Sequence, residues 1–600
     1  MGGPERVSAG QGLVVENLEV DYVTDDGTIR AVDNISFRIP PGLRMGFVGE
    51  SGSGKTTTAL ALMGMIDPPG RVSGGRARLG DIDLLALSPQ EQVRHRLASI
   101  SYIPQGAMNS LNPVTRIRDQ MVDGMLDHGV RLTSRERDIR VEELLAQVGL
   151  PADVARKFPH ELSGGMKQRV CIAIAISMGP KILIADEPTS ALDVITQRLV
   201  MQTLREVQEK VGAGLILIGH DMGLMAQFVD ELMVLRKGQL VEQGPVRQIF
   251  KSPKHEYTRA LIDSVPSGAG RLPGASSTVA TVATANGTTG NGTSGGTTRR
   301  PPLLELKGAG KNFPSGLFGK GGTRALFPLS LRLEGDEPRV ISVVGQSGSG
   351  KSTLAGILLG FLQPSEGQVL FEGKPVSGKG AKRPADYYRK VQAVFQDPYA
   401  AYNPFYKVDH ALAEPLVNFG LARTRAEILS NMQRACEVVG LDPAQTIHRF
   451  AHQMSGGQRQ RLMVGRAVML KPKLLVADEP VSMVDASLRS TILASLKDLK
   501  DRHGVSIVYI THDLATAYEV SDYVIVLNKG RVVEAGTPEI VIKLPAHAYT
   551  RELVASIPWP DPDRSWGAPN GMNAAETMAH TSDDVRTIVR DTISGFQLST

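Results

Sequence analysis

Gly49-Glu50-Ser51-Gly52-Ser53-Gly54-Lys55-Thr56 is the stretch of sequence that decides the fold. Its glycines let the backbone curl with several N–H groups pointing inward, which is the geometry that receives a chain of phosphates. Lys55 is expected to reach the β- and γ-phosphates, and the hydroxyl of Thr56 to bind magnesium. Apolar residues 45–48 predict a buried strand before the loop, and residues 57–63 predict a helix whose positive end faces the phosphates. The sequence therefore predicts a nucleotide-binding P-loop.

The same motif returns in the second half of the chain. It is written Gly345-Gln346-Ser347-Gly348-Ser349-Gly350-Lys351-Ser352 and follows the apolar residues 340–344. Two P-loops in one chain indicate an internal repeat. A chain of 600 residues is also too long for one hydrophobic core, so several compact units are expected.

The composition argues against several classes of protein. Hydrophobic residues make up 42% of the chain, but no apolar run approaches the ~18 residues that cross a bilayer, so we expect no transmembrane helix. The net charge of +5 is small for this length and gives no sign of a nucleic-acid partner. Cys171 and Cys436 are the only cysteines, and both lie in apolar helical patterns, so neither a disulfide scaffold nor a cysteine metal site is expected.

Each half contains an acidic pair directly after an apolar run. Residues 182–185 lead into Asp186 and Glu187, and residues 474–477 lead into Asp478 and Glu479. A strand of this kind places its final aspartate beside the P-loop, where it can hold magnesium through the water shell of the ion. The following glutamate can reach a water in line with the γ-phosphorus and act as a general base. We therefore predict an ATPase centre in each half.

Further polar residues stand at fixed places around these centres. Gln105 ends a short predicted strand, Ser163-Gly164-Gly165 opens a long apolar helix whose N-terminus can receive an anion, and His220 follows the apolar residues 215–218. A histidine there could hydrogen-bond a γ-phosphate. Tyr22 could stack on an adenine ring or simply be half-buried, and Phe313 holds the corresponding place in the second half.

Taken in order, this set of motifs resembles the nucleotide-binding domain of ABC transporters. The second half repeats it with Gln396, Ser455-Gly456-Gly457, Asp478-Glu479 and His512. The resemblance implies an α/β fold, namely two tandem P-loop ABC ATPase domains, each a RecA-like core with an antiparallel β subdomain and a helical subdomain, joined by a flexible linker.

The resemblance also assigns roles to individual residues. The catalytic group would be Glu187, Glu479, His220 and His512. The ATP-binding residues would be Tyr22, Gly49, Ser51, Gly52, Ser53, Gly54, Lys55, Thr56, Thr57, Gln105, Ser163, Gly164, Gly165 and Asp186 in the first half, and Phe313, Gly345, Ser347, Gly348, Ser349, Gly350, Lys351, Ser352, Thr353, Gln396, Ser455, Gly456, Gly457 and Asp478 in the second. The Mg²⁺ ligands would be Thr56, Gln105, Asp186, Ser352, Gln396 and Asp478.

The two halves are expected to share their nucleotides. A P-loop alone leaves the γ-phosphate exposed on one side, while the helices that begin at Ser163 and Ser455 have unpaired N–H groups that need an anion. We therefore expect the P-loop of each half to hold its ATP together with the Ser-Gly-Gly of the other half.

The domain boundaries follow from the motifs and from changes in composition. We predict a first nucleotide-binding domain over residues 11–266, a second over 303–558 and a tail over 559–600, with a possible short helix near 584–593. Residues 267–302 between the domains are rich in Gly, Thr, Ala and Ser, which predicts a flexible linker.

Two further features are similar to the ATPases of the oligopeptide, dipeptide and nickel uptake group. Asn-Pro pairs follow the glutamines at residues 112–113 and 403–404, and histidine-tyrosine elements follow each core at residues 255–261 and 547–553. The resemblance implies an ATPase subunit of a peptide importer on the cytoplasmic face of the membrane. Its partners would be two transmembrane permease subunits and an extracytoplasmic substrate-binding protein. Many relatives carry a cysteine cluster for an iron–sulfur centre, but residues 262–302 contain no cysteine, so we expect no iron–sulfur cluster.

The loops after the two glutamines are expected to receive a cytoplasmic helix of each permease. Leu111, Tyr399, Tyr402 and Phe405 are the candidate apolar contacts, although they could instead pack the helical subdomain. The main alternative function is a tandem-cassette ATPase that acts on the ribosome as a translation factor. That class would need a long charged helical arm between the cassettes, whereas this linker is rich in Gly and Thr. A DNA-repair ATPase would need an inserted coiled coil or zinc site, and a scaffold would not need both Glu187 and Glu479.

Overall fold

The computed structural model describes residues 12–24, 27–106, 110–190, 192–263, 301–314, 322–376, 385–397, 401–481, 486–563, 566, 587–590, 593–594 and 596–599. Contacts divide the chain into two compact units. Unit 1 comprises Met1–Val265, Ser482–Thr491 and Arg551–Ser582, and unit 2 comprises Pro266–Val481, Ile492–Thr550 and Asp583–Thr600. Of the predicted linker over residues 267–302, residues 267–300 lie outside the described residues, and the four-part division stays a prediction.

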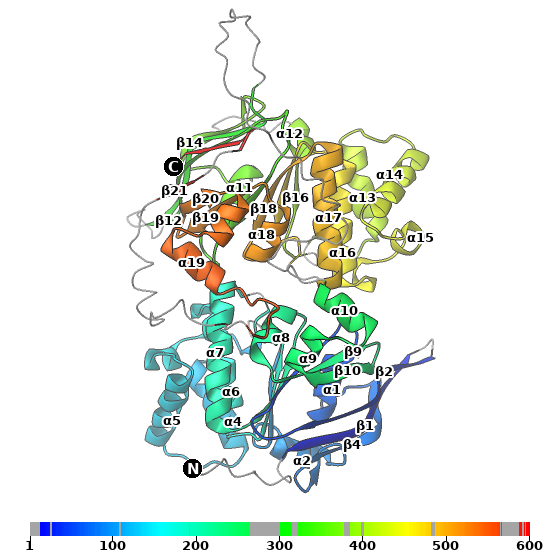
Figure 1. Cartoon of the computed structure of the whole chain (residues 1–600), viewed down its shortest axis with the longest axis vertical. Coiled ribbons are helices and arrows are strands. Elements are labelled where there is room, and N and C mark those ends of the chain that lie inside the picture. The colour runs from blue at the N-terminus through cyan, green and yellow to red at the C-terminus, as the bar shows by residue number, and fades with distance from the viewer. Residues whose placement is uncertain are drawn as a thin grey trace, which may run out of the picture. The chain divides into compact units, whose positions relative to one another are not determined.

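The first repeat begins with an antiparallel sheet of strand order β2-β1-β4-β5 (Figure 1). Its strands are β1 (Leu13–Thr24), β2 (Gly27–Ile39), β4 (Gly70–Leu79) and β5 (Ile82–Asp83). Buried and exposed positions alternate in β2, as they do when one face of a sheet covers a core. The predicted antiparallel subdomain is confirmed.

The second sheet of this repeat carries the P-loop. Its strand order is β10-β9-β3-β8-β7-β6, with only the β9–β10 pair antiparallel. The strands are β3 (Arg44–Val48), β6 (Ile100–Ile103), β7 (Ile182–Asp186), β8 (Gly214–Ile218), β9 (Glu231–Arg236) and β10 (Gln239–Pro245). Both β7 and β8 are buried along their whole length, as expected of parallel strands covered on two faces.

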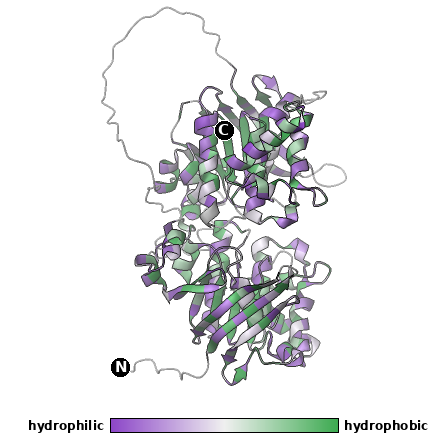
Figure 2. Ribbon diagram, turned by 90° about the vertical axis from the view of Figure 1, so that its right-hand side faces the viewer, coloured by the Kyte–Doolittle hydropathy of each residue, from purple (hydrophilic) through white to green (hydrophobic). Residues whose placement is uncertain are grey.

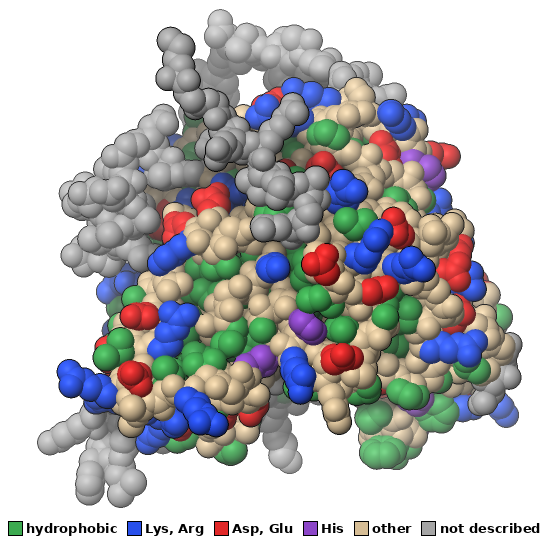
Figure 3. All heavy atoms as spheres, turned by 90° about the horizontal axis from the view of Figure 1, so that it is seen from below, with side chains coloured by type: hydrophobic (Ala, Val, Ile, Leu, Met, Phe, Trp, Pro, Cys, Tyr) green, Lys and Arg blue, Asp and Glu red, His purple; other side chains and the backbone are tan. Residues whose placement is uncertain are grey.

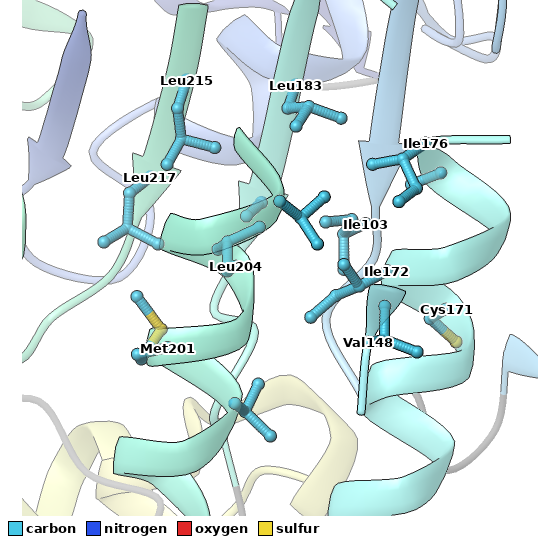
Figure 4. Packing of buried hydrophobic residues seen from close by; sticks show 14 of the residues in the cluster. Ile103, Val148, Cys171, Ile172, Ile176, Leu183, Met201, Leu204, Leu215 and Leu217 are labelled. Atoms are coloured by element: carbon cyan, nitrogen blue, oxygen red, sulfur yellow. The ribbon is translucent and has the colours of Figure 1, made fainter. Parts of the chain in front are cut away.

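Helices surround this sheet and supply the helical subdomain. They are α1 (Lys55–Leu62), α2 (Pro89–His95), α4 (Ile117–Asp127), α5 (Ser134–Gln147), α6 (Gly164–Ala175), α7 (Val194–Val211), α8 (Met222–Phe228), α9 (Val246–Lys251) and α10 (Glu256–Asp263), with short 3₁₀ turns η1 (Ala152–Arg156) and η2 (Pro159–Glu161). Side chains from α6, α7 and the sheet meet in one hydrophobic cluster, in which Figure 4 labels Ile172, Met201, Leu204, Leu183 and Leu215. The core therefore joins the helical layer to the strands that carry the acidic pair.

The second repeat has the same plan. Its strands are β11 (Leu304–Pro314), β12 (Gly322–Leu333), β13 (Val340–Val344), β14 (Glu366–Phe371), β15 (Lys374–Pro375), β16 (Val391–Val394), β17 (Leu474–Asp478), β18 (Ser506–Thr511), β19 (Tyr523–Asn528) and β20 (Arg531–Gly536). Its helices are α11 (Lys351–Leu358), α12 (Ala385–Lys390), α13 (Val408–Asn418), α14 (Arg425–Val438), α15 (Pro443–Thr446), η3 (Ala451–Gln453), α16 (Gly456–Met469), α17 (Ala486–His503), α18 (Leu514–Val520), η4 (Glu539–Lys543) and α19 (Ala548–Ala555).

The C-terminal residues add a strand to each sheet of the second repeat. β21 (Ile588–Val589) pairs in parallel with β20, and β22 (Phe596–Ser599) pairs antiparallel with β12. Phe596 is buried and packs against the ring of Tyr523, while Arg590 forms an ion pair with the fully buried Glu534. The short helix predicted near residues 584–593 is therefore wrong at 588–589, because these β-branched residues continue an existing sheet.

Hydropathy follows the layers of each unit. Figure 2 shows that the strands of the central sheets are largely hydrophobic, and Figure 3 shows Lys and Arg interspersed with Asp and Glu on one face. Among the residues that the structure describes, no helix is long and apolar enough to cross a membrane.

Candidate active sites

The P-loop lysine of the first repeat is held by its own loop. Lys55 is the first residue of α1, and its Nζ donates to the carbonyl oxygens of Gly49 and Glu50, each at 2.8 Å, and to Ser53 Oγ at 3.1 Å. Gly49 has φ 152°, and a Cβ there would lie 2.1 Å from the carbonyl oxygen of Leu235. Only glycine fits at this position. Its small size lets the loop backbone pass close to β9 and present its carbonyl oxygens to the ammonium group of Lys55.

The second repeat reproduces this arrangement. Lys351 Nζ donates to the carbonyl oxygens of Gly345 at 2.6 Å and Gln346 at 2.7 Å. A Cβ on Gly345 would lie 2.2 Å from the carbonyl oxygen of Leu527. Two segments about 300 residues apart thus fold into the same loop.

The two candidate bases sit in a backbone conformation that few glutamates adopt. Glu187 has φ 43° and Glu479 has φ 48°, both in the left-handed region. Their N–H groups donate to Ile218 O at 2.9 Å and Ile510 O at 2.8 Å on the neighbouring strands. The predicted glutamines meet them, because Gln105 Nε2 donates to Glu187 Oε2 at 2.6 Å and Gln396 Nε2 donates to Glu479 Oε2 at 2.7 Å.

The predicted histidines bind the other carboxylate oxygen. His220 Nδ1 lies 3.4 Å from Glu187 Oε1, and His512 Nδ1 lies 2.8 Å from Glu479 Oε1. Burial opposes ionisation of Glu187, but the bonds and charges of His220, Ser190 and Lys55 outweigh it and lower its pKa to about 2. The pKa of Glu479 is also lowered, since His512 and Lys351 overcome its burial. Both glutamates are therefore carboxylates at neutral pH, the form that accepts a proton.

The glutamates also shift the pKa values of the two histidines, in the upward direction. Burial lowers the pKa of His220 and His512, but the hydrogen bond and charge of Glu187 and Glu479 more than compensate, so both pKa values are raised. The positive charge on the ring is thus favoured beside the place where the γ-phosphate is expected.

The two aspartates predicted to hold magnesium differ between the repeats. In the first repeat the phenol of Tyr102, on β6, donates to Asp186 Oδ2 at 2.9 Å. Tyr102 pairs with Ile184 on β7, and the equivalent register position beside Val476 is Ala393, which has no hydroxyl. Burial, with Glu479 nearby, raises the pKa of Asp478 to about 6. Burial also raises the pKa of Asp186, where bonds from Tyr102 and Thr56 counteract it. The first aspartate is therefore held in one orientation by a donor that the second lacks.

This difference leads to a prediction about magnesium demand. Replacing Tyr102 by Phe removes a hydrogen bond to a carboxylate, an interaction of about 1.5–3 kcal/mol. In a chain that also carries Lys351→Ala, so that only the first site binds, we expect the Mg²⁺ midpoint of ATP binding to rise about tenfold. Equilibrium binding of labelled ATP across a Mg²⁺ series measures it. Tyr406→Phe, at a half-exposed ring stacked on His410, is the matched control. An unchanged midpoint in Tyr102→Phe would contradict the prediction.

Four other residues that were predicted to bind nucleotide lie outside the P-loops and the strands of the acidic pairs. Ser163 and Ser455 cap α6 and α16, and their side chains accept from Met166 N at 3.4 Å and Gln458 N at 3.2 Å. Tyr22, near the end of β1, is partly buried, whereas Phe313, in the same place on β11, is 40% exposed. The roles of all four in nucleotide binding stay predictions. Sequence reasoning missed Tyr102, whose contact with Asp186 spans 84 residues and follows no motif.

Comparisons with known proteins agree with this geometry. The family model for the ABC transporter matches residues 32–190 and 328–482, and the model for the oligopeptide/dipeptide transporter C-terminal region matches 241–288 and 533–582. The chain therefore belongs to the ABC transporter family, as an importer ATPase with two ATP-binding domains. The predicted fold and ATPase activity are confirmed.

Curated relatives extend over almost the whole chain. The glutathione import ATP-binding protein GsiA of Escherichia coli O157:H7 is 36% identical over 596 residues, covering 93% of this chain and 92% of the relative. The protein of the same name from Salmonella choleraesuis (strain SC-B67) is 37% identical over 576 residues, covering 92% and 90%. The translation-factor alternative finds no support among these relatives.

Two solved structures each match part of this chain. The chain is similar to cbiO1 from Clostridium perfringens, with 27% identity, a TM-score of 0.36 and coverage of 41% of this chain and 92% of that one. It is also similar to the bacterial ABC transporter cassette MJ0796 in its dimeric structure, with 27% identity, a TM-score of 0.36 and coverage of 39% and 99%.

Proposed function

We propose that this chain hydrolyses ATP to drive uptake of small peptides, with glutathione-like tripeptides included, through two separate permease subunits. The observation that carries the proposal is that both repeats bring Lys, Gln, Glu and His together while also matching the C-terminal region of oligopeptide/dipeptide transporters. The relatives are glutathione import proteins by name, which supports the same class of cargo. The chain would work at the cytoplasmic face of the membrane, supplied by an extracytoplasmic substrate-binding protein.

Magnesium fits the donors at each candidate site. Hydroxyl, carboxylate and amide oxygens are hard ligands of the kind Mg²⁺ prefers. Thr56, Gln105 and Asp186 would hold it in the first repeat, and Ser352, Gln396 and Asp478 in the second. The ion would neutralise charge on the phosphates, while Lys55 or Lys351 orients them.

The chain's own residues would carry the proton step. Glu187 and Glu479 would accept a proton from the attacking water, each held by its glutamine and histidine. The protonated histidine beside each carboxylate would stabilise negative charge that develops on the γ-phosphate. This division of roles needs no other base from the protein.

The docking contacts need one correction. Leu111 is 6% exposed and Tyr402 is 5% exposed, so both pack the helical subdomain rather than face a partner. Burial raises the pKa of the Tyr402 phenol, and its ring lies beneath the guanidinium of Arg466. Tyr399 lies outside the described residues. The expectation of a surface contact at Leu111 and Tyr402 is wrong, because their apolar bulk completes a core.

Two other side chains are better candidates for a permease contact. Phe405 is 85% exposed, and Val114, which occupies the equivalent place after the Asn-Pro pair in the first repeat, is 80% exposed. Single exposed apolar residues are common on protein surfaces. Here, however, both repeats expose an apolar residue at the same position, as would be needed to contact two permease subunits. Phe405 was expected from the sequence, whereas Val114 was not.

We predict that Val114→Asp with Phe405→Asp uncouples the chain from its permeases. ATP binding by the isolated chain should stay within about twofold of the parent, since surface substitutions away from a site change little. Recovery of the chain with membranes, and uptake of labelled peptide, should fall at least about tenfold, as for the loss of a central apolar contact. Val93→Asp, at a half-exposed valine of α2, serves as control. Normal uptake by the double variant would refute the docking role.

Cargo is tested by transport itself. Proteoliposomes or cells that carry the chain with its permeases and binding protein should take up labelled di-, tri- or oligopeptides only with ATP. Competition by glutathione distinguishes a γ-linked tripeptide from ordinary α-peptides. Uptake of neither kind of molecule, with ATPase activity intact, would overturn the peptide proposal while leaving the family assignment in place.

A further inference from the structure

The histidine-tyrosine element after each core touches the P-loop. Tyr257, in the first turn of α10, accepts a hydrogen bond through its hydroxyl from the N–H of Glu50 at 2.9 Å. Tyr549, in the first turn of α19, accepts one from the N–H of Gln346, also at 2.9 Å. Both rings are buried, 7% and 2% exposed. The same long-range contact has thus formed twice in one chain, between segments about 200 residues apart.

The peptide group that each tyrosine holds is the one that holds the lysine. The Gly49–Glu50 peptide donates its N–H to Tyr257, and its carbonyl oxygen, on Gly49, accepts from Lys55 Nζ at 2.8 Å. In the second repeat the Gly345–Gln346 peptide donates to Tyr549 and accepts from Lys351 Nζ at 2.6 Å. Because a peptide group is planar, fixing its N–H also fixes the direction of its oxygen.

An acid, partly buried at Glu242 and fully buried at Glu534, holds the start of each tyrosine-bearing helix. Glu242 on β10 accepts from the N–H groups of Lys254 at 2.9 Å and His255 at 3.0 Å. His255 Nδ1 then accepts from the N–H of Tyr257 at 3.1 Å, which places its ring proton on Nε2. Each of these hydrogen bonds satisfies a backbone N–H group at the start of α10. Tyr257 is therefore held at its backbone N–H as well as at its hydroxyl.

The second repeat repeats these links. Glu534 on β20 accepts from the N–H groups of Ala546 and His547, each at 2.9 Å, and His547 Nδ1 accepts from Tyr549 N at 3.1 Å. Glu534 is fully buried and is also paired with Arg590. Both elements lie within segments matched by the oligopeptide/dipeptide transporter C-terminal region.

We propose that Tyr257 and Tyr549 are positioning residues for ATP binding: each orients the first P-loop peptide and, through it, the phosphate-binding lysine. This rests on the proposed role of Lys55 and Lys351. The histidine-tyrosine element is thereby part of the nucleotide site, although it lies far from every P-loop residue in sequence.

The test uses the full chain with one site silenced. In a chain that carries Lys351→Ala, Tyr257→Phe keeps the buried ring and removes only the hydroxyl that accepts from Glu50. The dissociation constant for ATP, measured by equilibrium dialysis, should rise about tenfold, because a partly buried N–H loses its partner and the lysine its fixed anchor. Tyr549→Phe in a chain that carries Lys55→Ala should do the same at the second site. Tyr406→Phe is again the control.

A double-mutant cycle separates positioning from simple stability. If Tyr257 acts through Lys55, adding Tyr257→Phe to a chain that carries both Lys351→Ala and Lys55→Ala should weaken ATP binding by less than about twofold further. Equal losses of affinity with and without Lys55 would overturn the proposal and leave the tyrosine a structural residue. A lowered melting temperature with an unchanged dissociation constant, in both Tyr257→Phe and Tyr549→Phe, would overturn it too. If instead the chain that carries both Lys55→Ala and Lys351→Ala binds ATP normally, the P-loop assignment itself fails, whatever the tyrosines do.

Discussion

Chains that carry both Glu187→Gln and Glu479→Gln should bind ATP normally and hydrolyse it about 10²–10⁴-fold more slowly than the parent. The amide keeps the shape of each side chain but cannot take a proton from water. Glutamine can also keep the partners seen in the structure, because its carbonyl oxygen still accepts from Gln105 or from His220. Phosphate release measures turnover, and equilibrium binding of labelled ATP measures affinity.

The control for this pair is Glu209→Gln, at an exposed glutamate whose nearest partner is Arg44 at 3.6 Å. It removes the same charge without touching either site and should leave turnover within about twofold. Near-normal hydrolysis by the doubly substituted chain would show that another group activates the water. The single substitutions would then show whether one site alone sustains turnover.

The second large effect concerns binding rather than turnover. Replacing Lys55 and Lys351 together by Ala should weaken ATP binding about 100-fold or more, because each lysine is expected to make charge-assisted bonds to phosphate oxygens worth about 3 kcal/mol. Lys210→Ala, at an exposed lysine in the last turn of α7, should bind ATP like the parent. If the variant with both lysines replaced still binds ATP tightly, the two P-loops do not bind the phosphates through these side chains.

The sequence predicted the parts of each site that are local in the chain. A P-loop and an acid pair behind an apolar strand are short patterns. The structure also brings Gln105 and His220 to this site, where both contact Glu187, although the sequence analysis expected them at magnesium and at the γ-phosphate. Those contacts arise because the carboxyl ends of parallel strands meet along one edge of the sheet. The four-residue run before each acid was therefore enough to place the acid.

The tyrosine contacts could not be predicted in this way. Tyr257 meets Glu50 across 207 residues and Tyr102 meets Asp186 across 84, and neither contact leaves a spacing pattern in the sequence. The burial of Leu111 and Tyr402 depends on how loops pack on the helical layer, which hydrophobicity alone does not decide. The strands β21 and β22 were not predicted from the sequence, because strands of two and four residues are too short to show a periodic pattern of hydrophobic residues.

The C-terminal strand β22 has a consequence for biosynthesis. The last strand of the first repeat, β10, ends at Pro245, whereas the second repeat receives β22 only at Phe596–Ser599. A ribosome adds about 5–20 residues per second, so roughly 20–70 s separate the two events. During that interval the nascent first repeat can close its sheets. β12 is complete at Leu333, and its edge stays unpaired until β22 is made, so it could pair with the edge of another chain. Order of synthesis thus leaves the edge of β12 to be covered last, after all the other strands of its sheet have been made.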